Sequence, residues 1–593
     1  ALRLTSSPKA ETSPRFSPDG RFLAFLADRD GNGSQVWLMD RRGGEATRLT
    51  EYKGAVSALA WSPDGGRLAL VVKDPDPSDG EAGTKAKRPK PVVIRRLQFK
   101  RDGEGYLGDL RNHIHVFDVA AKTTVQVTSG AYDDAEPVFS PDGRAIAFTS
   151  NRSADPDSND NTDIFVVEAK AKSEPRRLTT SPGAESAPAF SPDGKTITFV
   201  GGADPKDIWY GTLHVGVVPV AGGPETFLTR ALDRVVSTPR FSPDGRSILF
   251  LVEEGGNSHL ARIPAEGGAV ERAVDGERDV QAFDVGRGGE IAVLESQPEQ
   301  PSEVFAVVGH DLRPVSHVND AFLRGIVLGL VERFQAKSRD GTGVDGFLVR
   351  PPLAPTARKL PAILRIHGGP NGQDSTAFNL EWQMLAAQGY AVVASNPRGS
   401  TGYGEEYSRA IFGDWGNKDY DDVMAALDHV VQMGAADPGR LGVGGWSYGG
   451  MMTDFVIVKT DRFKAAIAGA SEANTLANYG VDEYQHAWEV EAGLPWRNVE
   501  TWLRLSPWFQ IEKVTTPTLF IGGLDDHNVP FLNSEQLYQA LRRLGKETEL
   551  VGYPGESHGI TRPSFRKDRL ERYIAWYDAH LKPATASHAG GPR

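Results

Sequence analysis

The sequence predicts a two-domain protein, with an N-terminal β-propeller followed by an α/β domain built around a mostly parallel sheet. A Ser-Pro-Asp-Gly tetrapeptide recurs five times before residue 250, and strand and helix patterns alternate after about residue 330. The segment GVGGWSYGG at 442–450 then joins a strand to a helix through glycines. We place the propeller at residues 1–325, because a chain of 593 residues is too long for one core.

The repeat in the first half has the length and the turn chemistry of propeller blades. Successive copies begin 45 or 51 residues apart, except for one interval of 78, which is close to the ~40–50 residues of a four-stranded blade. Proline presets φ and glycine accepts a positive φ, so Pro-Asp-Gly predicts a tight turn between two strands. The copies begin at Phe16, Trp61, Phe139, Phe190 and Phe241.

The number of blades follows from these copies and from the triplet Arg-Leu-Thr, which closes several of them. A degenerate sixth copy begins at Phe283. The triplet ends units at Arg48–Thr50 and at Arg177–Thr179, and the chain itself opens with ALRLT. Because this opening resembles the tail of a blade that starts before residue 1, we predict a seven-bladed propeller.

The long interval contains an insertion at residues 73–110, whose positive charge allows two interpretations. Its stretch 85–101 has eight Lys or Arg residues, and such runs usually form a solvated loop. Alternatively, the run forms a basic lip that attracts the carboxylate of a peptide. The Asp-rich segment 153–163 lacks the glycine and the closing glutamate of a calcium loop, so we expect a polar turn and no metal site there.

Composition excludes several function classes. The net charge of −12 argues against a nucleic-acid-binding face, and no apolar run reaches the ~18 residues of a membrane helix. The absence of cysteine excludes disulfides, thiolate metal ligands and a cysteine nucleophile. The first residues show no signal segment, so we expect a cytoplasmic protein. They also lack an initiator Met, so we expect that the natural chain can begin before residue 1.

The second half predicts a parallel sheet with functional residues at the carboxyl ends of its strands. Ser447 lies at such an end, between the strand 441–445 and the helical stretch 449–459. Gly445 and Gly449 leave room for a strained turn that exposes the hydroxyl, which is the setting of a nucleophile elbow. We therefore predict an α/β-hydrolase domain at 326–582 and a disordered tail at 583–593.

A catalytic triad can be completed after later strands, in the order serine, acid, histidine that this fold uses. Asp525 and Asp526 follow one strand, and His558 follows the last strand in a glycine-bounded loop. The serine hydroxyl needs a base, and the base needs a carboxylate that fixes its tautomer. Each residue alone is compatible with a surface loop or a helix cap, but together they predict Ser447 as a nucleophile with His558 as its base.

Further motifs resemble those of the prolyl oligopeptidase family of serine peptidases, and of its acylaminoacyl-peptidase-like branch in particular. The resemblance covers essentially the whole chain. The family's Asp-x-x-Val-Pro motif implies that Asp526 is the acid, and its oxyanion hole implies the backbone N–H groups of Tyr448 and Gly369. The motifs are HGGP at 367–370, NPRGSTGYG at 396–404, GDWG at 413–416 and GWSYGG at 445–450.

The resemblance also implies a reaction and a substrate class. A short peptide would acylate Ser447 and water would release the acyl group, without a cofactor or a metal, and assembly into a homo-oligomer is expected. Many members hold the P2 carbonyl with an arginine two residues after the acid, whereas this chain has Asn528. The family's S1 pocket corresponds to residues 474–509, so we predict Tyr484 and Trp488 in its lining, although such dense aromatics more often form a core.

The sequence is compatible with recognition of either end of the peptide. An acylaminoacyl peptidase or oligopeptidase is our first interpretation, because a blocked N-terminus needs no acidic partner. Family dipeptidyl peptidases bind the free amine through a Glu-Glu pair with aromatic neighbours, which Glu253 and Glu254 lack. A carboxypeptidase-like enzyme would use the cations at 85–101. An esterase would share the triad, and a noncatalytic propeller that serves as a binding module would not use it.

Overall fold

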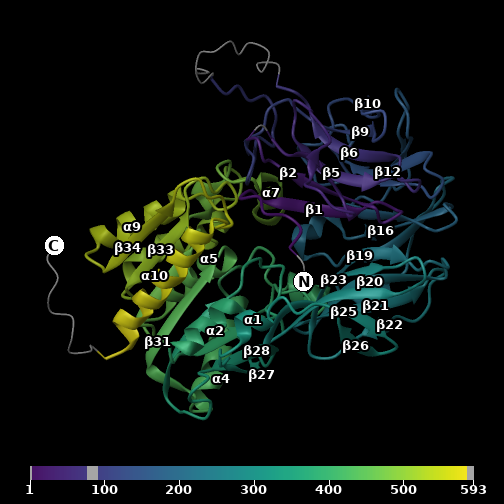
Figure 1. The fold of residues 1–593 in the computed structure, drawn as a ribbon. Coiled ribbons are helices and arrows are strands. Elements are labelled where there is room, and N and C mark those ends of the chain that lie inside the picture. The colour runs from purple at the N-terminus through teal and green to yellow at the C-terminus, as the bar shows by residue number, and fades with distance from the viewer. Residues whose placement is uncertain (1–2, 32, 77–90, 584–593) are drawn as a thin grey trace.

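The computed structural model describes residues 3–31, 33–76 and 91–583. Four-stranded antiparallel units form the first half, and a parallel pairing of Ser258 with Asp279 joins the last two of them into one sheet. Another sheet, of eight strands with helices on both faces, forms the second half (Figure 1). No helix in these ranges is long and apolar enough to cross a membrane. The predicted tail beyond residue 583 and residues 85–90 of the basic run lie outside the described residues.

The first three propeller units each contain four antiparallel strands. The first unit consists of β1 (Glu11–Phe16), β2 (Phe22–Ala27), β3 (Gln35–Asp40) and β4 (Thr47–Arg48). The second consists of β5 (Val56–Trp61), β6 (Arg67–Lys73), β9 (Asn112–Asp118) and β10 (Thr123–Gln126). The third consists of β11 (Asp134–Phe139), β12 (Ala145–Ser150), β13 (Asp163–Glu168) and β14 (Arg176–Arg177).

Three more units complete the described part of the propeller. The fourth consists of β15 (Ser186–Phe190), β16 (Thr196–Gly201), β17 (His214–Pro219) and β18 (Thr226–Phe227). The fifth consists of β19 (Val236–Phe241), β20 (Ser247–Glu254), β21 (Asn257–Pro264) and β22 (Glu271–Val274). The sixth consists of β23 (Asp279–Val285), β24 (Ile291–Gln297), β25 (Gln300–Val308) and β26 (Asp311–Pro314).

The Ser-Pro-Asp-Gly tetrapeptide recurs because it closes the turn between the first two strands of a unit. In the first unit the Ser17 hydroxyl donates to Asp19 Oδ1 at 2.5 Å and accepts the N–H of Phe22 at 2.9 Å. Asp19 Oδ1 also accepts the N–H of Arg21 at 3.0 Å. The next four copies repeat the bond from serine to aspartate and the bond from the following strand to serine.

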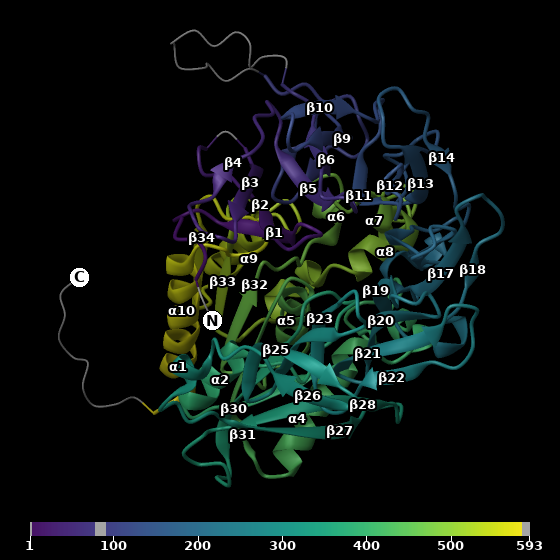
Figure 2. The ribbon, with the colours of Figure 1, turned by 45° about the vertical axis from the view of Figure 1, so that its right-hand side comes forward.

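The described residues form six blades, in agreement with the six units visible in the sequence, and the seventh blade, which would start before residue 1, stays a prediction. The units follow one another around a ring in Figure 2, from β1 through β18 to β25. In the first unit, the first residue of the triplet lies in a strand because Thr47 and Arg48 pair with Leu38 and Trp37 of β3. Residues 3–10 form no strand, since the opening triplet has no such third strand beside it within the described residues.

The insertion of the second unit lies between its second and third strands. It carries a short hairpin of β7 (Lys100–Arg101) and β8 (Gly105–Tyr106), which pair with each other. The hairpin belongs to none of the blade sheets. It is therefore free to contact the second domain.

The second domain is built on one sheet, in which β27 and β28 are antiparallel to each other and the other six strands are parallel. The predicted order of a propeller followed by an α/β-hydrolase sheet is confirmed. From one edge to the other, the strands are β27 (Leu330–Lys337), β28 (Gly343–Arg350), β30 (Ala391–Ser395), β29 (Leu360–Ile366), β31 (Ala436–Trp446), β32 (Ala465–Gly469), β33 (Thr518–Gly523) and β34 (Thr548–Tyr553).

Helices bury both faces of this sheet. One apolar core contains residues of α4 (Lys418–Gln432), α5 (Tyr448–Lys459) and α9 (Leu532–Arg543). The other contains residues of α2 (Leu380–Ala387) and α10 (Pro563–Leu581). The shorter helices are α1 (Asp320–Leu323), η2 (Pro205–Tyr210), η3 (Arg230–Leu232), α3 (Glu405–Arg409), α6 (Thr475–Asn478), α7 (Gln485–Ala492), α8 (Val499–Arg504) and η4 (Pro507–Lys513).

Candidate active site

Ser447 occupies a sharp turn between β31 and α5. Its backbone has φ 60° and ψ −126°, a conformation that residues other than glycine seldom adopt. The flanking glycines pack against backbone: a Cβ on Gly449 would lie 2.1 Å from the carbonyl oxygen of Ile366, and one on Gly445 would lie 2.3 Å from the carbonyl carbon of Gly449. This strained and closely packed turn has the geometry of a nucleophile elbow.

Asp526 and His558 are hydrogen-bonded to each other. His558 Nδ1 lies 2.8 Å from Asp526 Oδ2, whereas the neighbouring Asp525 is exposed. Burial raises the pKa of Asp526, and the bond to His558 opposes that rise. Trp446, the residue before Ser447, donates its indole N–H to the carbonyl oxygen of His558 at 3.1 Å. The histidine loop therefore lies beside the elbow.

A carboxylate from the propeller insertion holds the loops of this pair. Asp102, at the tip between β7 and β8, accepts the backbone N–H of His558 at 3.1 Å and that of His527 at 3.0 Å. Its own backbone N–H donates to Glu483 Oε2 at 2.8 Å. Sequence reasoning missed Asp102, because one acid within a basic stretch forms no motif. The insertion thus contacts three loops of the catalytic domain.

A pocket of about 290 Å³ opens beside Ser447. The two residues predicted for an S1 pocket, Tyr484 and Trp488, both line it. Trp209 comes from η2 of the propeller, so no motif of the catalytic domain could have pointed to it. The complete lining is Trp209, Gly369, Asn371, Trp415, Ser447, Tyr448, Met451, Glu472, Tyr484, Trp488, Asn528 and Val529.

The two residues predicted for an oxyanion hole face this same pocket. Tyr448 is the first residue of α5, so its N–H has no acceptor within the helix. Its side chain is buried, and its hydroxyl donates to Asp419 Oδ2 at 2.7 Å. Gly369 has φ 129°, and a Cβ there would lie 2.7 Å from the backbone nitrogen of Asn371. A glycine is therefore required at that position of the pocket wall.

Asn528 also lines the pocket, but its side-chain amide is already engaged. Its Nδ2 donates to Glu483 Oε1 at 2.9 Å and to the hydroxyl of Tyr484. An asparagine amide has only two N–H groups, so neither is left for the carbonyl of a P2 residue. In this arrangement the residue shapes the wall around Tyr484, and a donated bond to a substrate would require one of the two bonds to break.

Comparisons with known proteins identify the family. Residues 376–584 match the sequence profile of the prolyl oligopeptidase family. The uncharacterized peptidase YuxL of Bacillus subtilis is 33% identical over 97% of this chain and 91% of its own length. The chain belongs to the prolyl oligopeptidase family of serine peptidases. A dipeptidyl-peptidase 5 of Porphyromonas gingivalis is 26% identical over 98% of this chain and 88% of that protein.

The fold comparison covers both domains of this prolyl oligopeptidase family member. The acylaminoacyl peptidase of Pyrococcus horikoshii matches 98% of this chain and 90% of its own with a TM-score of 0.82. Sequence identity between the two is 23%. The likeness therefore supports the arrangement of a propeller ahead of a hydrolase domain, and it carries no statement about substrate.

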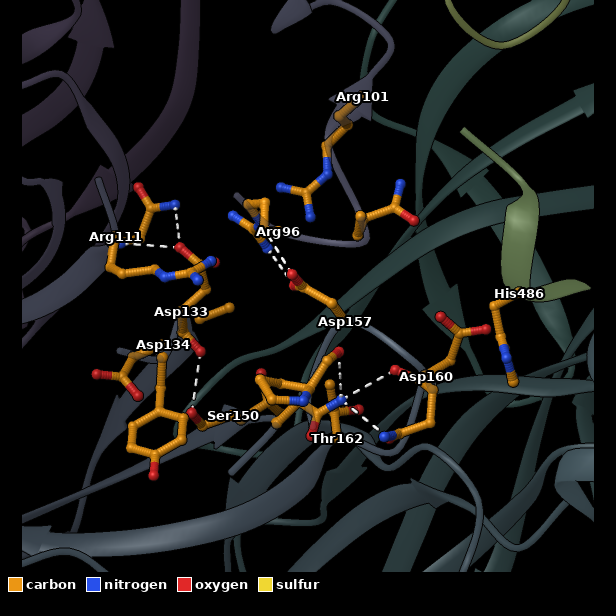
Figure 3. A pocket seen from close by; sticks show the side chains of 18 of the residues that line it. Arg96, Arg101, Arg111, Asp133, Asp134, Ser150, Asp157, Asp160, Thr162 and His486 are labelled. Carbon is orange, nitrogen blue, oxygen red and sulfur yellow. Dashed lines mark hydrogen bonds and ion pairs between the residues drawn. The ribbon is translucent and has the colours of Figure 1, made fainter. Parts of the chain in front are cut away.

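A larger cavity of about 660 Å³ lies between the propeller and the catalytic domain of this peptidase (Figure 3). It shares Trp209 and Tyr484 with the pocket. Two acids of its lining, Asp160 and Glu483, form no ion pair with any described residue, whereas the others are paired. The charged residues in the lining, apart from His486, are three arginines and five acids: Arg96, Arg101, Arg111, Asp133, Asp134, Asp157, Asp160 and Glu483.

The described part of the basic run does not form a lip of free cations. Arg96 points at Asp157 across the cavity in Figure 3, with a shortest separation of 2.6 Å between the charged groups. Arg101 pairs with Glu104 at 3.0 Å, and Lys100 Nζ donates to the carbonyl oxygen of Val481 at 2.8 Å. Arg96 and Lys100 thus attach the insertion to neighbouring segments, and among the described residues the lining of the cavity holds more acids than arginines.

Proposed function

We propose that the protein hydrolyses short peptides through an acyl-enzyme on Ser447. His558 takes the proton of the Ser447 hydroxyl as the oxygen attacks the peptide carbonyl, and it gives that proton to the leaving amine. Water then attacks the acyl-enzyme, with His558 again acting as base. Asp526 holds the ring by its 2.8 Å bond to Nδ1 and stabilises the imidazolium.

The observation that carries this proposal is the joint placement of the elbow and the acid–base pair. The strained turn at Ser447 presents its side chain to the pocket, and the Trp446 bond fixes the loop of His558 beside it. The backbone N–H groups of Tyr448 and Gly369 would receive the oxyanion. In other serine hydrolases the removal of one such donor costs ~3–4 kcal/mol of transition-state stabilisation.

A serine-directed fluorophosphonate tests the nucleophile directly. We expect Ser447→Ala to abolish labelling and to lower peptide hydrolysis at least ~10³-fold. Ser302→Ala on β25, which lines neither the pocket nor the cavity, serves as the control and should keep both properties. Labelling that survives Ser447→Ala would contradict the proposal and would favour a noncatalytic role for the chain.

The charge of the cavity favours some peptide ends over others. We infer that a peptide held in the pocket extends past Tyr484 into the cavity, where Asp160 and Glu483 are the acids without ion pairs among the described residues. A terminal carboxylate would be repelled there, whereas an acylated end is neutral and a free amine is attracted. This argues for an oligopeptidase or acylaminoacyl peptidase, and against a carboxypeptidase-like enzyme.

The same two acids favour a second candidate, an enzyme that binds a free N-terminal amine, as a dipeptidyl peptidase does. Dipeptide anilides with a free or an acetylated N-terminus, compared with N-blocked peptides with a free or an amidated C-terminus, separate these activities. A larger kcat/KM for the acetylated anilide would support the acylaminoacyl peptidase, and a larger kcat/KM for the free amine would support the second candidate. A strict requirement for a free C-terminal carboxylate would contradict both candidates.

A further inference from the structure

The pocket beside Ser447 has aromatic walls on several sides. Trp209 and Tyr484 meet edge to face with ring centroids 5.7 Å apart. Trp415 lies 5.4 Å from Trp488 and 5.4 Å from Tyr448, centroid to centroid. A side chain that enters this pocket is therefore surrounded by π faces and edges from both domains.

A buried acid, Glu491, holds two of the aromatic segments that form these walls through hydrogen bonds. Glu491 Oε1 accepts the indole N–H of Trp415 at 2.7 Å and the hydroxyl of Tyr210 at 2.8 Å. Tyr210 directly follows Trp209 on η2, so the same acid ties the propeller wall to the catalytic wall. The arrangement of the rings is thus built into the fold.

One acid lines the pocket itself. Glu472 is only 4% exposed, and its Oε2 accepts the amide N–H of Asn478 at 2.8 Å. Its other oxygen, Oε1, is buried and has no hydrogen-bond partner among the described residues. The carboxyl group of Asp482 lies near that of Glu472, since the amide of Asn478 also donates to Asp482 at 2.8 Å. A buried oxygen without a partner is costly unless a bound group supplies the missing bond.

We propose that this pocket is an S1 site for a peptide residue with a cationic side chain, and that Glu472 recognises its charge. The inference rests on the proposed function, since it takes Ser447 as the nucleophile that the pocket adjoins. The lining contains no Lys, Arg or His that would repel such a side chain. Tryptophan and tyrosine faces within about 6 Å attract a desolvated ammonium or guanidinium.

The shape and the electrostatics of the pocket agree with this assignment. Met451 and Val529 provide apolar contact for the methylene stem of lysine or arginine, whose charged end then reaches Glu472. Burial, with the Asp482 carboxyl nearby, raises the pKa of Glu472 well above its usual range. A cation beside Oε1 favours the ionised carboxylate and so lowers that pKa again.

Matched substrates test the proposal. N-acetyl-alanyl p-nitroanilides with lysine, norleucine or glutamine at P1 share a similar length and differ in charge and polarity. We expect the wild-type protein to hydrolyse the lysine substrate with the largest kcat/KM. A preference for norleucine would overturn the proposal, and a preference for glutamine would show that Glu472 serves neutral hydrogen bonding.

The variant Glu472→Gln keeps an oxygen that can accept from Asn478 and removes the charge. We expect it to lower kcat/KM about 30-fold for lysine and less than about threefold for norleucine. Glu535→Gln, an exposed glutamate of α9, is the matched control and should change neither value. Equal losses for both substrates would overturn the assignment, because they indicate a purely structural role.

Two further measurements keep the outcome interpretable. Competitive inhibition of the wild-type protein by n-butylammonium, with n-butanol as the uncharged comparison, tests the cation site without any variant. Inhibition by both compounds alike would contradict the proposal. Fluorophosphonate labelling separates the two levels: wild-type protein that is labelled but has no lysine preference overturns only the S1 assignment, whereas labelling that survives Ser447→Ala overturns the proposed function.

Discussion

The nucleophile and the acid–base pair of this active site are held in place by different parts of the molecule. The Ser447 elbow depends on contacts within the catalytic domain, where Gly445 and Gly449 pack against backbone. The loops that carry Asp526 and His558 are also hydrogen-bonded to Asp102, which belongs to the propeller insertion. One half of the site therefore depends on local backbone sterics, and the other half depends in addition on how the two domains meet.

This difference suggests a division of roles. A change at the domain interface should loosen the proton-transfer groups and leave the position of the nucleophile unchanged. A change within the elbow should remove the nucleophile whatever the propeller does. Variants on each side of this division can be ranked by the size of their expected effect.

The largest effect is expected for Gly449→Ala. A Cβ at this position would lie 2.1 Å from the carbonyl oxygen of Ile366, and backbone cannot move away as a flexible side chain could. We expect the free energy of unfolding to fall by about 4 kcal/mol or more and fluorophosphonate labelling to be lost. Thermal unfolding and labelling measure the two losses.

Gly108→Ala in the insertion is the matched control for this change. It has no atom within 4 Å of its added Cβ and no positive φ. The control should melt and label like the wild-type protein. Normal labelling of Gly449→Ala would show that the elbow does not depend on this close contact.

The next effect is expected at the interface, for Asp102→Ala. Without the carboxylate, the backbone N–H groups of His527 and His558 lose their acceptor, and the loops can shift. Because small misplacements of catalytic groups are costly, we expect kcat to fall about 30-fold with little change in KM. Steady-state kinetics with one peptide substrate measure the split.

A conservative variant distinguishes positioning from general damage. Asp102→Asn keeps an oxygen that can accept an N–H and should recover most of kcat. Glu104→Gln, on the same hairpin and bonded to Lys73 and Arg101, should leave kcat unchanged. If Asp102→Ala kept full kcat, the insertion would have no part in positioning His558.

The same division explains which residues could be predicted from the sequence. Ser447, Asp526 and His558 lie in short motifs whose order along the chain is characteristic of the fold, so local patterns indicate them. Asp102 and Trp209 reach the site from the propeller, and such placement depends on packing between domains. The seventh blade stays a prediction from the triplet near the start of the chain, because such a triplet joins a strand through its first residue only where a neighbouring strand pairs with it, as Arg48 pairs with Trp37.

Glu472 illustrates a different limit of sequence reasoning. Acids shortly after a strand are common, and nothing in the segment distinguishes one that caps a helix from one that lines a pocket. The structure shows a buried side chain with one oxygen that lacks a partner among the described residues. Such a property depends on all the neighbours of an atom, and a sequence does not show them.

A smaller effect is expected where the propeller contributes to substrate binding and not to proton transfer. Trp209→Ala removes the propeller wall of the pocket while the loops of His558 keep their bonds to Asp102. The loss of one aromatic contact costs about 1.5 kcal/mol, so we expect KM to rise about tenfold with kcat nearly unchanged. A fall in kcat with constant KM would instead place Trp209 with the positioning groups.

The smallest effect on catalysis is expected for Tyr448→Phe, although Tyr448 directly follows the nucleophile. Its proposed contribution is a backbone N–H, which the substitution keeps, so kcat should stay within about threefold. The variant removes the hydroxyl that donates to the buried Asp419 at 2.7 Å, and leaving that carboxylate short of a donor should cost about 1–3 kcal/mol of unfolding free energy. Denaturant unfolding and kcat then report separately on stability and on the oxyanion hole. A large drop in kcat at unchanged stability would show that the hydroxyl, and not the backbone N–H alone, supports the reaction.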